Sequence, residues 1–180
     1  MRSHGINKQN NTQNHKKQTM KNQTKITAEP GKQELFITRE FEAPRELGFR
    51  AFCAPELLLQ WLGPRDMTME IDRLDNRTGG SYRFLHCNAG GNKFGFNGVI
   101  HEVAEPERLI RTFEFEGLPE KGHVSLETAT FEALPGERTK LVIHSVFRSV
   151  ADRDGMVMSG MERGVVDSHQ RLDELLAKGF

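Results

Sequence analysis

The chain is poor in cysteine, tryptophan and tyrosine, with two, one and one of these residues among 180. Cys53 and Cys87 lie far apart and have no CxxC spacing. A disulfide scaffold and a cysteine zinc site are therefore not expected, and the chain suits a reducing cytoplasm. The sequence also lacks any run of 18 apolar residues, so we expect no membrane span.

Motifs that usually mark catalytic, metal or phosphate sites are missing as well. The histidines beyond residue 30 are scattered and include no HExxH or HxH spacing, so no metal site is predicted. The glycine-rich stretch 90–95 leads into a strand pattern instead of a helix, which favours a hairpin turn over a phosphate-binding loop. There is no GxSxG elbow, and Cys53 has no identifiable base partner. We predict no cofactor and assign no catalytic residue.

The formal net charge is zero, but the charge is unevenly distributed along the chain. Residues 1–30 hold six of the 25 basic side chains and one of the 25 acidic ones. The other 150 residues therefore hold 19 basic and 24 acidic side chains, an excess of five negative charges. A mildly acidic domain does not suit nucleic acid, and no such partner is expected.

Residues 1–32 are expected to form a disordered polar tail, followed by one domain over residues 33–180. The first thirty residues are rich in Asn, Gln, Lys and Thr, and only Ile6 and Ile26 offer much apolar surface. Such a segment does not offset the entropy of ordering it, and it has no secretory-type apolar stretch. Met20 is a candidate for the true start, with residues 1–19 as upstream sequence. A genuine disordered extension is the alternative.

Within the domain, hydrophobic alternation and turn signals predict a strand, two short helices, six strands and a long helix. The first strand covers 34–41, and the short helices cover 45–53 and 56–62. Short turns between consecutive strands indicate an antiparallel sheet, one face of which must wrap the long helix. The predicted fold class is therefore α+β. The six later strands are expected at 67–71, 81–87, 94–103, 109–116, 123–133 and 139–147.

The last helix is expected to run unbroken from Asp152 to Lys178, because this segment has no proline and its apolar residues recur at helical spacing. Gly160 and Gly164 lie on or beside its apolar face. A glycine inside a helix costs about 1 kcal/mol relative to alanine. Two interpretations are open: the helix packs closely on the sheet, or the absent side chains leave a space for a small molecule.

Several short motifs occur together along the chain. They are Ala43-Pro44-Arg45-Glu46, Trp61-Leu62-Gly63-Pro64, Gly79-Gly80-Ser81-Tyr82, Glu102-Val103 with Pro106-Glu107-Arg108-Leu109, Arg138-Thr139-Lys140-Leu141 and the Gly160/Gly164 helix. With these motifs in this order, residues 33–178 resemble SRPBCC (START-like) proteins, and most nearly bacterial proteins similar to the C-terminal domain of the activator of the ninety-kilodalton heat-shock chaperone ATPase. The resemblance implies the helix-grip fold. Because that fold serves lipid carriers, receptors, enzymes and chaperone partners, function depends on the site.

Period-two alternation gathers aromatic residues of three strands on faces that we expect to point toward the helix. Arg111 lies within one of these rows, so either the row reverses at a bulge or a cation faces the interior. An ordinary core and a ligand cavity both fit this pattern. For a cavity, the predicted ligand-binding residues are Trp61, Tyr82, Phe84, Phe96, Gly98, Glu102, Phe113, Met161, Gly164 and Val165.

Two of these residues have alternative interpretations of their own. Trp61 precedes a Gly-Pro stop and is either a hydrophobic plug or the lid of the cavity mouth. Glu102 faces inward if the alternation of Gly98 and Ile100 continues. It then either accepts hydrogen bonds from nearby amides or orients a ligand.

Three functional classes remain. The first is the binding of a small, largely apolar molecule between sheet and helix. The second is a chaperone partner, as the resemblance suggests, although the eukaryotic activator has a separate N-terminal domain and here a polar tail precedes residue 33. The third is an enzyme of cyclase or hydrolase type acting on a molecule in the cavity. The sequence names no ligand.

Overall fold

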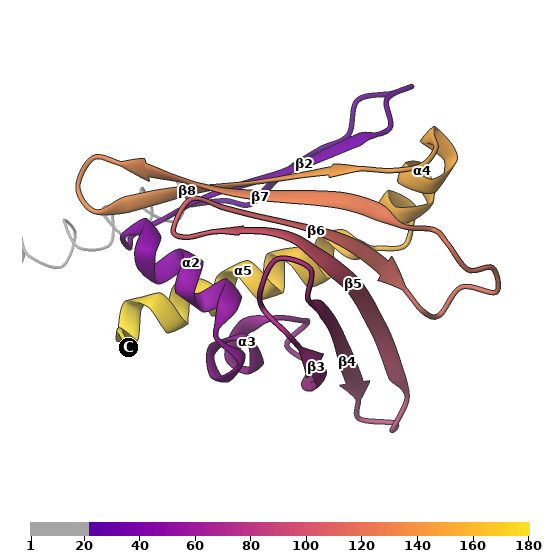
Figure 1. Ribbon diagram of the computed structural model, residues 1–180, viewed down its shortest axis with the longest axis horizontal. Helices are drawn as coiled ribbons and strands as arrows, with labels where there is room; N and C mark the ends of the chain where they lie inside the picture. Colours follow the sequence, from indigo (N-terminus) through magenta and orange to yellow (C-terminus); the bar gives the residue numbers. More distant parts are fainter. Residues whose placement is uncertain (1–21) are drawn as a thin grey trace, which may run out of the picture.

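The computed structural model describes residues 22–180, in which an eight-stranded sheet curves over one long helix (Figure 1). Neighbouring strands all pair antiparallel, in the order β1-β2-β8-β7-β6-β5-β4-β3. The predicted α+β helix-grip architecture is confirmed. The strands are β1 (Lys25–Thr27), β2 (Glu34–Phe41), β3 (Met67–Leu74), β4 (Ser81–Asn88), β5 (Lys93–Ala104), β6 (Arg108–Phe115), β7 (Ser125–Leu134) and β8 (Arg138–Val146).

Two short helices follow β2, and two further helices end the chain. Pro44 and Pro55 stand at the beginnings of the short helices, where the missing N–H of proline is not needed. Figure 1 shows both short helices on the same side of the sheet as the long C-terminal helix. The helices are α2 (Arg45–Cys53), α3 (Pro55–Trp61), α4 (Val150–Met158) and α5 (Met161–Lys178).

The C-terminal helical segment is broken, so the prediction of one helix over 152–178 is wrong. α4 ends at Met158 with Ser159 as its C-cap, and α5 begins after Gly160, whose φ of 81° is left-handed. This backbone conformation is strained for any residue with a Cβ and open to glycine. Gly160 is exposed, and a Cβ added there would meet nothing within 4 Å. The glycine therefore serves a change of direction between two helices and lies on no packed face.

Gly164 lies inside α5, and its missing side chain faces a loop. A Cβ added there would have the Cγ atom of Pro64 as its nearest neighbour, at 3.6 Å. Pro64 belongs to the loop after α3, which also donates the backbone N–H of Gly63 to Ser168 Oγ at 2.9 Å. The missing side chain of Gly164 thus faces the α3–β3 loop instead of the sheet, across a distance at which one methyl group makes an ordinary contact.

Alanine substitutions at the two glycines are expected to change the free energy of unfolding in opposite directions. Gly164→Ala is expected to raise the free energy of unfolding by up to about 1 kcal/mol, because 3.6 Å is an ordinary contact and alanine favours a helix. Gly160→Ala is expected to lower it by about 1–2 kcal/mol, because alanine is strained at positive φ. Urea unfolding measures both values. A loss of stability in Gly164→Ala would mean that the loop cannot take one more methyl group.

Two hydrophobic cores form within residues 22–180. The larger joins α2, α3 and the C-terminal half of α5 to the sheet, with Phe49, Phe52, Phe84, Phe131, Leu141 and Leu172 among its members. The smaller consists of Leu35, Ile37 and Phe147, with half-buried side chains such as Met156, Met161 and Val165 packed on it. The start of α5 is therefore held over β2 and β8, and its far end over α2 and α3.

Residues 25–27 form a strand, so the predicted tail boundary at residue 32 is wrong for this segment. β1 pairs with β2, and Ile26 packs on the smaller core. The buried guanidinium of Arg153 donates to the carbonyl oxygen of Glu29 at 2.9 Å. The strand is thus held by pairing with β2 and by the packing of Ile26, and the residues that follow it are held by buried Arg153. Residues 1–21, with the candidate start Met20, lie outside the described residues.

Candidate ligand-binding site

Aromatic side chains of three strands share the face of the sheet that points toward α5. Cross-strand partners lie on one face, and Phe84 pairs with Phe96, which in turn pairs with Phe115. Phe84 belongs to the same core as Leu172 of α5, which identifies this face as the concave one. The predicted orientation of these rows is confirmed.

Three of the phenylalanines remain half-buried and outside both cores. The ring of Phe96 lies 5.6 Å from that of Phe113 and 5.2 Å from that of Phe115. His86 adds a fourth ring at 5.0 Å from Phe96. Among the described residues, none of these four belongs to either core. They form an aromatic wall of tilted rings that keeps part of its surface accessible.

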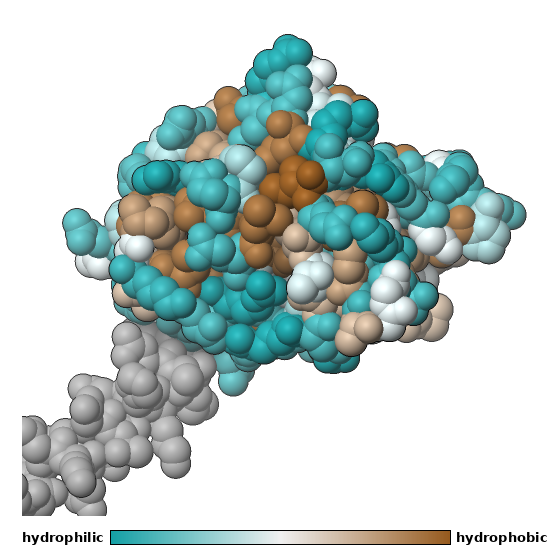
Figure 2. Space-filling model, turned by 90° about the horizontal axis from the view of Figure 1, so that it is seen from below, coloured by the Kyte–Doolittle hydropathy of each residue, from teal (hydrophilic) through white to brown (hydrophobic). Residues whose placement is uncertain are grey.

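The opposite wall comes from the helices. Met156, Met161 and Val165 are also half-buried, and they pack on the smaller core over β2 and β8. In the order of the sheet, β7 separates β8 from the aromatic wall on β5 and β6. We call the space between the two walls the groove. Figure 2 shows apolar side chains gathered in a hollow on the face seen from below, ringed by polar ones.

An ion pair lies on the floor of the groove. Arg111 of β6 and Glu127 of β7 are cross-strand partners, and Arg111 Nε donates to Glu127 Oε2 at 3.3 Å. Their side chains are 20% and 19% exposed, so neither is sealed in. The guanidinium carbon of Arg111 lies 4.9 Å from the centre of the Tyr82 ring. Two alternatives were predicted for Arg111: a reversal of the row at a bulge, or a cation that faces the interior. The structure shows the second.

Gly98 does not open space for a ligand, which corrects the prediction for this residue. A Cβ at position 98 would lie 1.9 Å from the carbonyl oxygen of Thr112 and 2.7 Å from the Tyr82 ring. The Tyr82 hydroxyl donates to that same carbonyl oxygen at 2.7 Å. Burial raises the pKa of Tyr82, so the hydroxyl keeps its proton. The absent side chain of Gly98 lets Tyr82 reach across β5 to β6.

Glu102 faces outward, so the prediction that it faces inward is wrong. A β-bulge between Ile100 and Glu102 shifts the alternation, and Glu102 pairs with the outward-facing Ile110. Its carboxylate accepts two hydrogen bonds from Arg108 on the outer face. These hydrogen bonds lower the pKa of Glu102. The extra residue moves the carboxylate to the side of the sheet away from the helix.

Trp61 is the predicted plug, and the lid interpretation is not supported. Its side chain is 2% exposed, and its ring centre lies 4.6 Å from that of Phe52. The indole N–H donates to the carbonyl oxygen of Ala51 at 2.9 Å, which satisfies its polar group. Phe84 and Tyr82 are buried in the same core. These three support the walls of the groove from behind.

The predicted residues thus divide into three groups. Phe96, Phe113, Met161 and Val165 bound the groove, and Trp61, Tyr82 and Phe84 support it. Gly98, Glu102 and Gly164 contribute no lining side chain. The prediction missed Phe115, which alternation from Phe113 would have included. It also missed Glu127, since no spacing in the sequence reveals which residue lies opposite Arg111.

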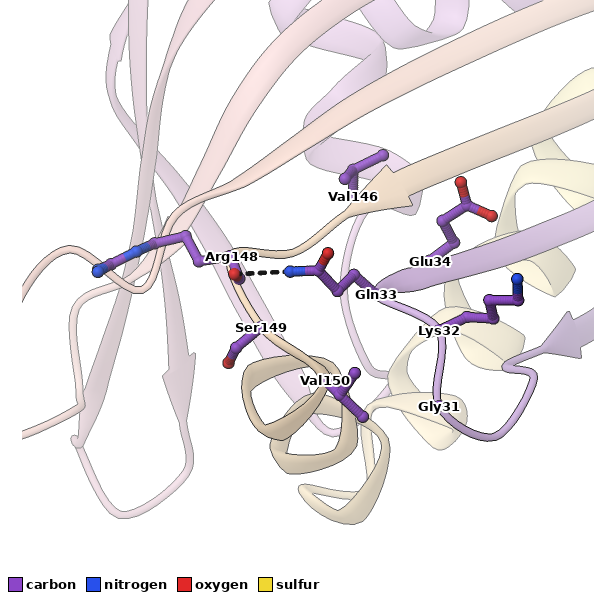
Figure 3. Close-up of a pocket in the computed structure, with 8 residues that line it drawn as sticks. All are labelled: Gly31, Lys32, Gln33, Glu34, Val146, Arg148, Ser149 and Val150. Atoms are coloured by element: carbon purple, nitrogen blue, oxygen red, sulfur yellow. Dashed lines mark hydrogen bonds between the residues drawn. The ribbon is translucent and has the colours of Figure 1, made fainter.

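A different hollow of about 460 Å³ lies where β2 begins and β8 ends, beside the start of α4 (Figure 3). Gln33 Nε2 donates to the carbonyl oxygen of Arg148 across it at 2.7 Å. Most of its lining residues are exposed and none was predicted, and Lys32 and Glu34 bring opposite charges to its rim. It lacks aromatic side chains, so we place the candidate site in the groove. The lining residues are Gly31, Lys32, Gln33, Glu34, Val146, Arg148, Ser149 and Val150.

The described part of the chain contains no cluster of side chains suited to bind a metal ion. Within residues 22–180, no three His, Cys, Asp or Glu side chains gather closely enough to hold an ion. Cys53 and Cys87 are both free, and burial raises the pKa of the Cys53 thiol. In the same range no helix has the length and apolar character needed to cross a membrane.

The fold and the groove define an SRPBCC-type protein with the helix-grip architecture. Residues 42–177 match the family described as activator of Hsp90 ATPase homolog 1-like protein. Because the match covers most of the chain, the protein belongs to this family. Among curated proteins, none matches the chain.

Solved structures of bacterial proteins share the fold. A protein from Rhodobacter sphaeroides is 25% identical and superposes with a TM-score of 0.77, covering 87% of this chain and 99% of that one. A protein from Chromobacterium violaceum is 26% identical, with a TM-score of 0.69 over 79% and 96% of the two chains. The AHSA1 protein from Silicibacter pomeroyi, 23% identical, has a TM-score of 0.67 over 82% and 99%.

Proposed function

We propose that the protein binds a small, largely apolar molecule in the groove between the concave face of the sheet and α5. The observation that carries this proposal is the aromatic wall of Phe96, Phe113 and Phe115, whose rings contact one another at tilted angles and stay half-buried outside both cores. Apolar surface left in contact with water costs about 25 cal/mol per Å². A ligand that covers these rings recovers that free energy.

The composition of the groove suits such a ligand. Binding sites for small molecules are mostly apolar, with a few polar groups that fix orientation. Here the apolar walls are aromatic on the sheet and aliphatic on α5, and Arg111 and Glu127 supply the polar groups. Met161 adds a flexible side chain that can adapt to ligands of different shape.

The neutral fluorescent probe N-phenyl-1-naphthylamine tests this proposal directly. We expect saturable binding with enhanced fluorescence, and an affinity about tenfold lower for Phe113→Ser, because removing one apolar contact of about 1.5 kcal/mol or more changes affinity by that factor. Leu126→Ser is the matched control: Leu126 is exposed and pairs with the outward-facing Thr112 on the opposite face of the sheet. Absence of saturable binding, or an equal loss in both variants, would contradict the proposal.

Contact with a chaperone is a second candidate, favoured by one observation. Val99, Leu126 and Val146 are exposed on the convex face of the sheet, and Leu126 and Val146 are direct cross-strand partners. The family description also refers to activation of the Hsp90 ATPase. If this face docks on the chaperone, purified protein should stimulate its ATPase and Leu126→Asp should abolish the effect. Unchanged ATPase rates would exclude this candidate.

A further inference from the structure

We propose that the groove selects molecules that carry an anionic group, and that Arg111 binds this group. The inference rests on the proposed function and adds the chemical class of the ligand: an apolar body with a carboxylate or a similar anion at one end. Three observations support it, namely the free donors of Arg111, its place along β6 and its position over Tyr82.

Most hydrogen-bond donors of Arg111 are not engaged. A guanidinium has five N–H groups. The Nε–H donates to Glu127 at 3.3 Å, and the two terminal nitrogens donate to no other side chain or carbonyl within residues 22–180. The side chain is 20% exposed. An arginine with its terminal nitrogens free can bind a carboxylate through two parallel hydrogen bonds.

The position of Arg111 matches a ligand that lies along β6. Arg111, Phe113 and Phe115 are successive inward-facing residues of this strand. At about 3.3 Å per residue, Arg111 and Phe115 are about 13 Å apart along the strand. A molecule of that length can place its anionic end at the guanidinium and its apolar body over the two rings.

The neighbours of Arg111 fix the position of its guanidinium and set how strongly it attracts an anion. The Tyr82 ring covers one face of the guanidinium, and the Tyr82 hydroxyl is fixed by its hydrogen bond to Thr112. Glu127 offsets part of the positive charge and repels an incoming anion. Removing the charge of Glu127 should therefore strengthen anion binding, and removing both charges should weaken it. A purely structural ion pair predicts no such reversal.

The experiment compares two probes that share one ring system. 1-Anilinonaphthalene-8-sulfonate has a sulfonate that N-phenyl-1-naphthylamine lacks. We expect Glu127→Gln to bind the sulfonate probe about tenfold more tightly than the double variant Arg111→Gln/Glu127→Gln, with the wild type between them. Both variants should bind the neutral probe with affinities within about threefold of each other, because the aromatic wall is intact. The double variant avoids leaving Glu127 buried without its partner.

A displacement measurement on the wild-type protein needs no substitution. Decanoate should displace N-phenyl-1-naphthylamine at a concentration at least about tenfold lower than decanol, although decanol is the more hydrophobic molecule. If the neutral probe binds but decanol displaces it as effectively as decanoate does, the anionic preference is wrong and the groove proposal stands. The same conclusion follows if the neutral probe binds and the substitutions leave the affinity for the sulfonate probe unchanged. If neither probe binds, the proposed function itself is wrong.

Discussion

Replacing Gly98 with alanine is expected to lower the free energy of unfolding by about 3 kcal/mol or more, at the upper end of the cost of overpacking a core. The added Cβ would lie 1.9 Å from the carbonyl oxygen of Thr112 and 2.7 Å from the Tyr82 ring. The first neighbour is backbone, so β5 and β6 must move apart. Urea unfolding followed by circular dichroism measures the loss.

Gly155→Ala is the matched control for this substitution. Gly155 lies inside α4, and a Cβ there would meet nothing within 4 Å. Its replacement should leave stability unchanged or raise it by up to about 1 kcal/mol. If Gly98→Ala were as stable as this control, Tyr82 would not fill the space beside β5, and a ligand could occupy it after all.

The stability of the protein is expected to fall as the pH is lowered from 6.5 toward 4, by up to about 1.4 kcal/mol per pH unit from His169 alone. The side chain of His169 is 3% exposed. Burial, and then the charge of Arg39, lower the pKa of His169 to about 3. An unfolded chain takes up this proton near pH 6.5 while the folded chain does not, so acid favours unfolding.

The surroundings of His169 show why it resists protonation. Thr24 Oγ accepts a hydrogen bond from Arg39 and lies 3.0 Å from His169 Nδ1, to which its own hydroxyl can donate. Arg39 also pairs with Asp173 of α5, and the Phe41 ring packs edge-on against the imidazole. A second cation here would face Arg39 at close range.

Urea unfolding between pH 7 and 4.5 checks this pH dependence. His169→Asn should be less stable than wild type at pH 7, with the difference narrowing as the pH falls. The exposed His101→Asn should follow the wild-type curve. Parallel curves for wild type and His169→Asn would show that His169 takes up its proton in the folded state.

The strands from β2 to β8 and the two short helices were the parts of the fold best predicted from the sequence. β2 has the predicted bounds, 34–41, because its alternation ends at Ala43-Pro44, where proline stops pairing. β6, and β5 as far as Ile100, keep strict alternation, so Phe96 and Phe113 were placed on the correct face. The alternation of apolar and polar residues and the turn residues between strands are local features, so the sequence alone indicates where a strand lies and which side chains share a face.

The bulge and the helix break could not be predicted by the same reasoning. Alternation carries no mark of the extra residue between Ile100 and Glu102, since its place depends on the pairing of β5 with β6. Apolar residues recur at helical spacing both before and after Gly160, so this pattern does not reveal a break in the helix. The left-handed φ there follows from how α4 and α5 pack on β2 and β8.

The polar floor of the groove shows a further limit of the sequence. Arg111 was conspicuous within an aromatic row, but its partner Glu127 is 16 residues away on another strand, and only the register of β6 and β7 joins them. Thr24 and Ile26 were assigned to the tail for the same reason. Their partners, Arg39 and β2, come later in the chain.

Methyl NMR during a titration with N-phenyl-1-naphthylamine tests the central claim most directly. The ring currents of the bound probe should shift the methyl signals of Met156, Met161 and Val165, which pack on the smaller core and form the helix side of the groove. The methyl signals of Leu126 and Val146, exposed on the convex face, should stay in place. Shifts confined to Leu126 and Val146, or none at saturating probe, would contradict a ligand site between the sheet and α5.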